Sequence, residues 1–271
     1  MTDQRAAANP GAVESAEFTE LASGERIAKA ATVLARNGIR PLLAATGADA
    51  RGLVCSLLPA GAEVYNNTSR TLEAIGVAAD IERSGRYQPL RLRLYRMDRE
   101  MQQHEMRALA ASPGYVVGSV HALTEGGSLL IASASGSQLG PLASGAGHVI
   151  LVIGAQKIVP DVATGMRRIY EYCYPLEDAR ARQAYGLPSG VNNILIINKV
   201  VTAERITAIL VNERLGFLST APGRQAVSAT GGGVRQLGQP DAGGKRAGRL
   251  IGPARSAGWA GRTRRGGRRR R

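Results

Sequence analysis

The sequence predicts an α/β protein with three layers (α/β/α) and a mostly parallel central sheet, because apolar runs of strand length alternate with segments of helical periodicity. Two of these runs, Tyr115–Val120 and His148–Gly154, are apolar almost throughout. Such strands are typical of parallel sheets that other elements cover on both faces. A third run, Ser128–Ala132, follows the first after a short polar turn. We therefore expect residues 115–161 to form the centre of the fold.

The residues before this stretch predict further helices and strands. Apolar residues at helical spacing predict helices, and short apolar runs between turn residues predict strands. Leucines that alternate with charged or polar residues predict an edge strand with one solvent-exposed face. In chain order, the expected elements are a helix at about 18–37 that Gly38 ends, a strand at 41–45, a helix at 49–58, a strand at 62–65, a helix at 72–79, the edge strand at 90–95 and a polar helix at 97–110.

The residues after the stretch predict one long helix and two strands. The helix begins at Pro160 and Asp161 and runs to about residue 184, and Asp161 is expected to be its N-cap. The strands Asn193–Val200 and Arg205–Val211 are joined by a short connection. We expect them to pair with each other as an antiparallel C-terminal strand pair.

The formal net charge of +14 is concentrated at one end of the chain. Residues 219–271 hold 13 lysines and arginines and one acid, Asp241, whereas residues 1–218 carry a net charge of only +2. The C-terminal segment is rich in glycine and lacks apolar periodicity, so we expect a disordered basic tail. Residues 1–16 are also expected to be disordered, which leaves 17–218 as a single α/β domain.

The composition excludes several classes of protein. The two cysteines, Cys55 and Cys173, lie far apart, which argues against a disulfide framework, a structural zinc site or an iron–sulfur cluster. The dinucleotide, phosphate-loop and nucleophile-elbow motifs are absent, so we expect no cofactor and no metal. The sequence shows no secretory signal and no apolar run long enough to cross a bilayer, which favours a cytoplasmic protein without membrane contact.

A polar elbow between the first two central strands carries the candidate chemistry. Glu125 is expected to act as a general base or a carboxylate nucleophile, and the amides of Gly126 and Gly127 to stabilise an oxyanion. Lys157 ends the next strand and is expected to bind a carboxylate or phosphate at the same sheet edge. An ion pair between Glu125 and Lys157 that only ties two loops is equally consistent with the pattern. The elbow residues expected at the site are Thr124, Glu125, Gly126, Gly127 and Ser128.

A second candidate loop follows the strand at 62–65. Asn67, Thr68 and Ser69 lie between this strand and the next helix, which is how an anion is presented to a helix N-terminus. Simple N-capping by Thr68 or Ser69 is the favoured alternative. We include all three residues among the expected ligand-binding residues.

Several blocks in order resemble the LUD (lactate-utilisation) domain family. They are residues 66–76, the elbow at 122–129, Lys157-Ile158-Val159-Pro160-Asp161, residues 175–177 and the ending at 205–217. The resemblance covers about 20–217. It implies an α/β/α fold related to ribose-5-phosphate isomerases and CoA-transferases, and a role beside iron–sulfur proteins in the oxidation of L-lactate to pyruvate. The cluster-binding cysteines of larger LUD proteins are absent here, so this chain is not expected to transfer electrons itself.

Three functions follow from these observations. The first is an accessory or ligand-binding component of lactate utilisation, with a small carboxylate or phosphorylated ligand and iron–sulfur proteins as partners. The second is a CoA-transferase-like or sugar-phosphate-isomerase-like enzyme that uses Glu125. The third is weak, nonspecific nucleic-acid contact through residues 219–271, although a tail without function is favoured because Trp259 is its only aromatic residue.

Overall fold

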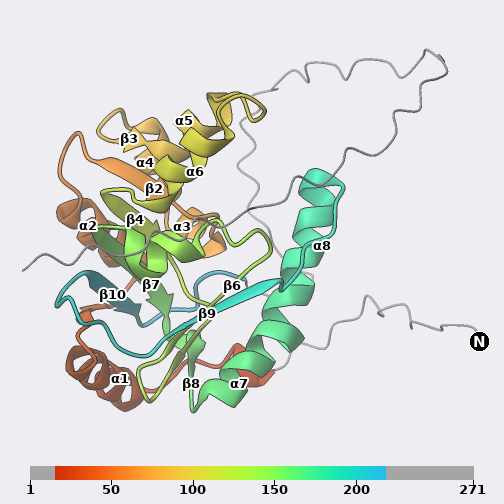
Figure 1. Ribbon diagram of the computed structural model, residues 1–271. Helices are drawn as coiled ribbons and strands as arrows, with labels where there is room; N and C mark the ends of the chain where they lie inside the picture. Colours follow the sequence, from red (N-terminus) through yellow and green to blue (C-terminus); the bar gives the residue numbers. More distant parts are fainter. Residues whose placement is uncertain (1–15, 218–271) are drawn as a thin grey trace, which may run out of the picture. The chain divides into compact units, whose positions relative to one another are not determined.

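The computed structural model describes residues 16–217, which form two sheets and the helices around them (Figure 1). The strands are β1 (Arg40–Ala44), β2 (Glu63–Asn66), β3 (Gln88–Pro89), β4 (Tyr115–Gly118), β5 (Ala122–Thr124), β6 (Leu129–Ser133), β7 (His148–Gly154), β8 (Ile158–Val159), β9 (Asn193–Ile197) and β10 (Ile206–Val211). The α-helices are α1 (Gly24–Arg36), α2 (Gly47–Leu57), α3 (Arg70–Ala74), α4 (Val77–Arg83), α5 (Leu90–Arg96), α6 (Gln103–Ala111), α7 (Val162–Arg167) and α8 (Tyr174–Tyr185). Shorter helical segments are η1 (Ala16–Phe18), η2 (Pro141–Gly145), η3 (Ala155–Lys157) and η4 (Arg168–Cys173).

The main sheet is parallel throughout, with the strand order β1-β10-β7-β4-β2-β3. Alternate side chains of β7 enter different cores, because successive residues of a strand point to opposite faces. Val149, Leu151 and Ile153 pack on one face of the sheet. Ile150 and Val152 pack on the other. The continuous apolar run in the sequence is thus explained by burial on both sides.

Different elements cover the two faces of the main sheet. Apolar residues of α2, α3 and α4, such as Val54, Leu72 and Ile81, share one core with it. On the opposite face, Leu34 of α1 and Leu129 of the second sheet share the other core. The α/β/α class and the mostly parallel sheet expected from the sequence are confirmed.

The second sheet is small and mixed, with the order β8-β5-β6-β9. Strand β6 runs antiparallel to both β5 and β9, and β5 runs parallel to β8. Its outer face packs on the segment that follows β8, where Ile169 of η4 contacts the same cluster as Ala122 and Leu130. The run Ser128–Ala132 therefore belongs to this sheet and not to the parallel one.

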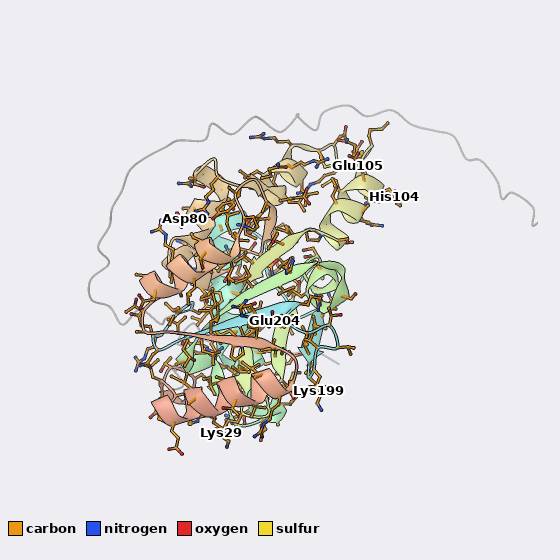
Figure 2. All side chains as sticks on the ribbon, turned by 90° about the vertical axis from the view of Figure 1, so that its left-hand side faces the viewer. Lys29, Asp80, His104, Glu105, Lys199 and Glu204 are labelled. Atoms are coloured by element: carbon orange, nitrogen blue, oxygen red, sulfur yellow. The ribbon has the colours of Figure 1, made fainter. Side chains whose placement is uncertain are left out.

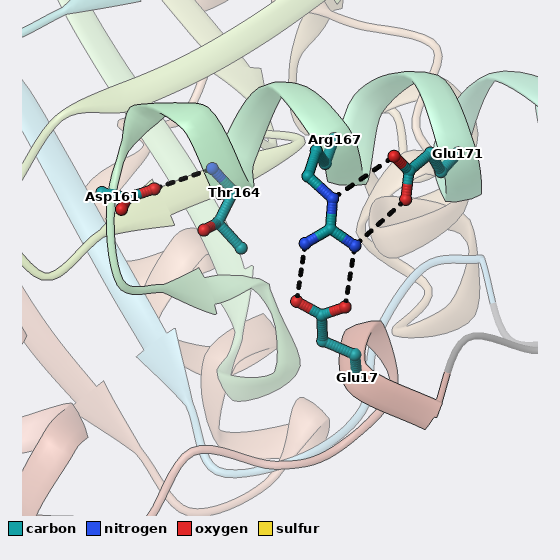
Figure 3. Close-up of polar contacts among 5 residues, drawn as sticks. All are labelled: Glu17, Asp161, Thr164, Arg167 and Glu171. Atoms are coloured by element: carbon teal, nitrogen blue, oxygen red, sulfur yellow. Dashed lines mark hydrogen bonds and ion pairs between the residues drawn. The ribbon is translucent and has the colours of Figure 1, made fainter.

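The segment after β8 is one continuous helical stretch made of α7, η4 and α8 (Figure 1). Asp161 caps it, because its side chain accepts a hydrogen bond of 2.7 Å from the backbone N–H of Thr164 (Figure 3). Arg167 donates hydrogen bonds to Glu17 and to Glu171, which ties η1 to the helical stretch. The expected capping role of Asp161 is confirmed.

The expected pairing between the last two strands is wrong. Strand β10 lies between β1 and β7 in the main sheet, and β9 pairs with β6 in the small sheet. Burial explains the separation. All six residues of β10 are buried, which suits a central strand of a sheet that is covered on both faces, whereas β9 is partly exposed and suits an edge position.

The edge strand expected at 90–95 is also wrong, because these residues form the helix α5. Leucine and arginine both favour helices, and Leu90 and Leu94 are four residues apart, so they lie on one face of a helix. The alternation of leucine with arginine is therefore compatible with either structure. Leu90 is buried in the helix that forms.

The predictions for residues 1–15 and for the basic tail at 219–271 lie outside the described residues, whereas Ala16, which was also expected to be disordered, begins η1. Within 16–217, none of the helices combines the length and the apolar character needed to cross a bilayer.

Gly38 offers a test of the packing at the end of α1. Its backbone has φ of +77°, and an added Cβ would collide with the carbonyl oxygen of Val200. Gly61 has the same φ, but no atom lies within 4 Å of the position that a Cβ would take there. We expect Gly61→Ala to lower the free energy of unfolding by about 1 kcal/mol and Gly38→Ala by roughly 3 kcal/mol. Urea denaturation measures both, and equal losses would show that the Val200 contact is not rigid.

Candidate functional site

A cavity of about 450 Å³ lies at the carboxyl ends of three neighbouring strands, β2, β4 and β7. In open α/β sheets, ligands bind in a crevice at this edge. The volume is within the usual range for pockets that hold small molecules. We call it the strand-end cavity; the lining residues that matter below are Asn67, Ser69, Ser119, His121, Lys157 and Arg168.

Lys157 reaches the strand-end cavity from the turn that follows β7. Its side chain is buried, and Nζ donates hydrogen bonds of 2.8 Å to Thr71 Oγ1 and to Ser119 Oγ. Ser119 follows β4, and its own hydroxyl donates to the carbonyl oxygen of Val152. Among the described residues, no carboxylate forms an ion pair with Lys157. Burial, together with the positive charge of Arg168, lowers the pKa of Lys157 to about 7.

Asn67 follows β2, lines the same cavity and has a buried, unpaired amide. Its side chain is 5% exposed, and neither Oδ1 nor Nδ2 has a hydrogen-bond partner among the described residues. Asn67 packs directly on Gly118, where an added Cβ would lie 2.7 Å from Nδ2. Buried polar atoms are nearly always hydrogen-bonded in folded proteins. An amide with both atoms unpaired beside a cavity is therefore well suited to contact a ligand.

Arg168 is a second buried cation at the cavity. It is 2% exposed, and its Nη1 atom donates to the backbone oxygen of His121 and to the sulfur of Cys173. Its Nε atom has no partner among the described residues, and its guanidinium lies over the ring of Tyr172. Arg168 and Cys173 belong to η4, a π-helical segment, and such segments frequently occur at functional sites.

The charges around the cavity favour an anion. Lys157 and Arg168 are buried without an acidic partner among the described residues. The one carboxylate among the described residues that line the cavity, Glu177, is occupied by two hydrogen bonds from Arg180. Burying a charge is costly unless an opposite charge or several hydrogen bonds compensate for it. A negatively charged ligand would supply that compensation.

His121 lines the cavity in its neutral form. Burial, together with the charges of Lys157 and Arg168, lowers its pKa to about 3. Its Nδ1 atom accepts a hydrogen bond of 3.1 Å from the backbone N–H of Ala132. The proton of the neutral ring therefore lies on Nε2, which is available as a hydrogen-bond donor.

The structure brings together four of the residues singled out from the sequence. Asn67, Thr68, Ser69 and Lys157 all line the strand-end cavity. Ser69 is also the N-cap of α3, since its hydroxyl accepts from the backbone N–H of Leu72. The simple capping alternative is therefore confirmed for Ser69.

The structure does not bring Glu125 to these residues. Its carboxylate accepts hydrogen bonds of 2.9 Å from Arg26 and 3.2 Å from Lys29, both on α1, and Glu125 is not among the residues that line the cavity. Hydrogen bonds from Lys29 and Arg26 hold the pKa of Glu125 below its ordinary value. The expected convergence of Glu125 and Lys157 is wrong, and so is the expected ion pair between them. The elbow lies next to α1 and follows β5, which belongs to the small sheet. It does not follow a strand of the parallel sheet.

The other elbow residues form the turn between β5 and β6. The Thr124 hydroxyl accepts from the backbone N–H of Ser128, and the Ser128 hydroxyl donates to Asn198. The carbonyl oxygen of Gly126 accepts a hydrogen bond from Asn37 at the end of α1. Gly127 has φ of +82°, which glycine tolerates best. None of these residues is among those that line the cavity.

Sequence reasoning missed His121, Ser119 and Arg168 as site residues. His121 was visible as a polar residue just after the predicted strand Tyr115–Val120, whereas Ser119 fell inside that strand because the observed β4 ends earlier, at Gly118. Within residues 16–217, no group of three or more histidine, cysteine or acidic side chains is arranged to hold a metal ion.

The fold and the cavity define an α/β/α protein with a cavity lined by basic side chains at the carboxyl edge of a parallel sheet. The model of the LUD domain family matches residues 27–211, which is more than half of the chain. The chain belongs to the LUD domain family, which associates it with lactate utilisation in general.

Comparisons with individual solved structures and curated proteins add no information on function. Among solved structures, the chain is similar to the crystal structure of a DUF162 family protein from Deinococcus radiodurans, with 12% sequence identity and a TM-score of 0.45. The alignment covers 71% of this chain and 100% of that one. No curated protein matches the chain significantly.

The buried amine predicts a pH-dependent stability. Because the pKa of Lys157 is lowered to about 7, the unfolded state binds more protons than the folded state above that pH. The stability contributed by this site therefore rises with pH, from neutral pH up to the ordinary pKa of lysine. Between pH 7 and pH 9, we expect the wild type to gain about 2 kcal/mol in free energy of unfolding relative to Lys157→Met. Denaturant titrations at several pH values measure the difference, and parallel pH profiles would contradict it.

Proposed function

We propose that the chain binds a small organic acid, of the lactate and pyruvate class, in the strand-end cavity and serves as a ligand-binding component of lactate utilisation. The observation that carries this proposal is the pair of buried basic side chains, Lys157 and Arg168, which have no acidic partner among the described residues. A carboxylate is the counter-charge that such acids supply. Membership of the LUD domain family supports the choice of ligand class.

The amide of Asn67 and the guanidinium of Arg168 are the proposed carboxylate anchors. A carboxylate has two oxygens that accept hydrogen bonds, and Nδ2 of Asn67 and Nε of Arg168 are both donors without a partner among the described residues. Hydrogen bonds to a charged group are stronger than those between neutral groups. Neutral His121 adds a donor that suits a hydroxyl or carbonyl oxygen on the same ligand.

Oxidation of lactate requires an electron acceptor, and we propose that partner proteins with iron–sulfur clusters supply it. The full sequence contains only two cysteines, Cys55 and Cys173, and ligation of a cluster by thiolates alone takes four. The chain would then hold or present the organic acid while its partners accept electrons. The nucleic-acid alternative concerns residues 219–271, outside the described residues.

An enzyme that uses Glu125 as nucleophile or base has less support. The carboxylate is engaged by Arg26 and Lys29 beside α1, at a place that does not line the cavity. A ligand in the strand-end cavity would meet other side chains instead.

Substitutions of the two anchors test the proposal. We expect Asn67→Leu to weaken lactate and pyruvate binding about tenfold or more, because a hydrogen bond to a carboxylate is lost. Arg168→Met should weaken binding at least as much. Isothermal titration calorimetry on folded protein measures both dissociation constants.

Arg205→Met is the matched control for Arg168→Met. Arg205 is also partly buried and donates to backbone oxygens, of Leu142, Ala143 and Ala146, but it does not line the cavity. Its replacement should leave the dissociation constants unchanged. Equal losses in the two arginine variants, or full binding by Asn67→Leu, would contradict the proposed anchors.

Glu125→Gln tests the separation of the elbow from the cavity. Its ion pairs are partly exposed, so we expect a loss of less than about 1 kcal/mol in the free energy of unfolding. Organic-acid binding should be unchanged, because the carboxylate lies outside the strand-end cavity. Calorimetry and urea denaturation provide the two readouts. Weaker organic-acid binding without a loss of stability would instead show that Glu125 contributes to the ligand site.

A further inference from the structure

The amine of Lys157 has a geometry suited to covalent chemistry as well as to binding. A neutral amine has two N–H donors and one lone pair. Both donors can be used by the two hydrogen bonds to Thr71 and Ser119, each 2.8 Å long. The hydrogen bonds fix the nitrogen, and the lone pair is then left without a partner among the described residues. Because Lys157 lines the strand-end cavity, a ligand there can approach this nitrogen.

The surroundings keep a large fraction of this amine neutral near pH 7. The groups that act on Lys157 are Arg168 and Cys173 of η4, and the neighbouring His121 is neutral. Burial and the charge of Arg168 disfavour the ammonium form, which lowers the pKa to about 7. Lysines desolvated in this way act as nucleophiles toward carbonyl groups.

The remaining charged residues of the wall do not reverse this balance. They are Arg70, Arg91, Glu177 and Arg180. Arg70 pairs with Glu73, and Glu177 pairs with Arg180, so the carboxylate at the wall is already occupied. No ion pair stabilises the ammonium form of Lys157 among the described residues.

We propose that Lys157 captures a 2-oxo acid, such as pyruvate, as a covalent imine in the strand-end cavity. This inference rests on the proposed organic-acid site. Asn67 and Arg168 would hold the carboxylate, and the adjacent carbonyl carbon would meet the amine nitrogen. A 2-hydroxy acid such as lactate binds the same anchors but has no carbonyl group to react.

The reaction balances without any redox partner. The nitrogen of Lys157 attacks the carbonyl carbon, and a carbon–nitrogen bond forms as the carbonyl π bond opens onto oxygen. Two protons from the amine pass to that oxygen, which leaves as water, and a C=N bond replaces the C=O bond. The hydroxyls of Thr71 and Ser119 lie at hydrogen-bond distance from the nitrogen and can relay these protons.

Reductive trapping tests the imine directly. The full-length protein is incubated with pyruvate at pH 7 and treated with sodium borohydride, which reduces an imine to a stable secondary amine. Peptide mass spectrometry then locates the adduct. We expect modification of Lys157 to be at least about tenfold faster than that of exposed lysines, because amines in water are mostly protonated at neutral pH.

The chain contains its own controls. It has only four lysines, and Lys29 and Lys199 are exposed at the surface (Figure 2). Lys157→Arg should abolish the rapid adduct, whereas Lys29→Arg and Lys199→Arg should retain it. Lactate in place of pyruvate should give no adduct, and excess lactate should compete with pyruvate. The yield on Lys157 should rise with pH around a midpoint near 7.

Calorimetry with pyruvate, without borohydride, separates this inference from the proposed function. Binding of pyruvate without a selective adduct on Lys157 would overturn the imine and leave the organic-acid site intact. Adducts formed at equal rates on Lys29, Lys157 and Lys199 would overturn it as well. Absence of both binding and adduct would overturn the imine and the proposed function together.

Discussion

The structure of the site depends on the hydrogen bonds that Lys157 makes to Thr71 and Ser119. They join the turn after β7 to the segments that follow β2 and β4, so one side chain links the carboxyl ends of three parallel strands. Two neutral hydroxyls compensate only partly for the burial of an amine. The positive charge of Arg168 adds to the cost of the ammonium form.

The fold separates two polar regions that are neighbours in the sequence. The elbow around Glu125 faces α1 and fixes that helix through Arg26 and Lys29. The strand-end cavity lies at the edge of the main sheet and carries the buried cations. The division arises because the chain leaves the main sheet after β4 and builds the small sheet before it returns as β7.

Much of this arrangement was predictable from the sequence, for a physical reason. Strands buried on both faces are apolar throughout, so β4 and β7 were recognisable, and polar residues after parallel strands meet at one edge. These two regularities correctly placed Asn67, Ser69 and Lys157 around one cavity. They failed for Glu125, because the sequence does not show that β5 and β6 belong to a different sheet. Membership of a sheet depends on long-range pairing, which short apolar runs do not specify.

Arg168 was missed because arginine is rarely buried, although its position fits the buried face of the helical stretch. Arg167 and Arg168 are adjacent in the helical stretch after β8. Arg167 is exposed beside Glu17 (Figure 3), whereas Arg168 is buried at the cavity. The buried residues of α7 and η4 recur every three or four positions, which is the ordinary helical repeat; they are Gly165, Arg168, Ile169, Tyr172 and Cys173. A helical wheel therefore places Arg168 on the buried face, but its charge makes burial unexpected.

An NMR titration of the lysine side chains tests the central claim most directly. The claim is that Lys157 is an amine buried at the cavity without an acidic partner among the described residues. With ¹³C-labelled lysine, the Lys157→Arg variant assigns its Cε signal among the four lysines. We expect this signal to titrate with a midpoint near pH 7. A midpoint near the ordinary value for lysine, about 10.4, would contradict the claim.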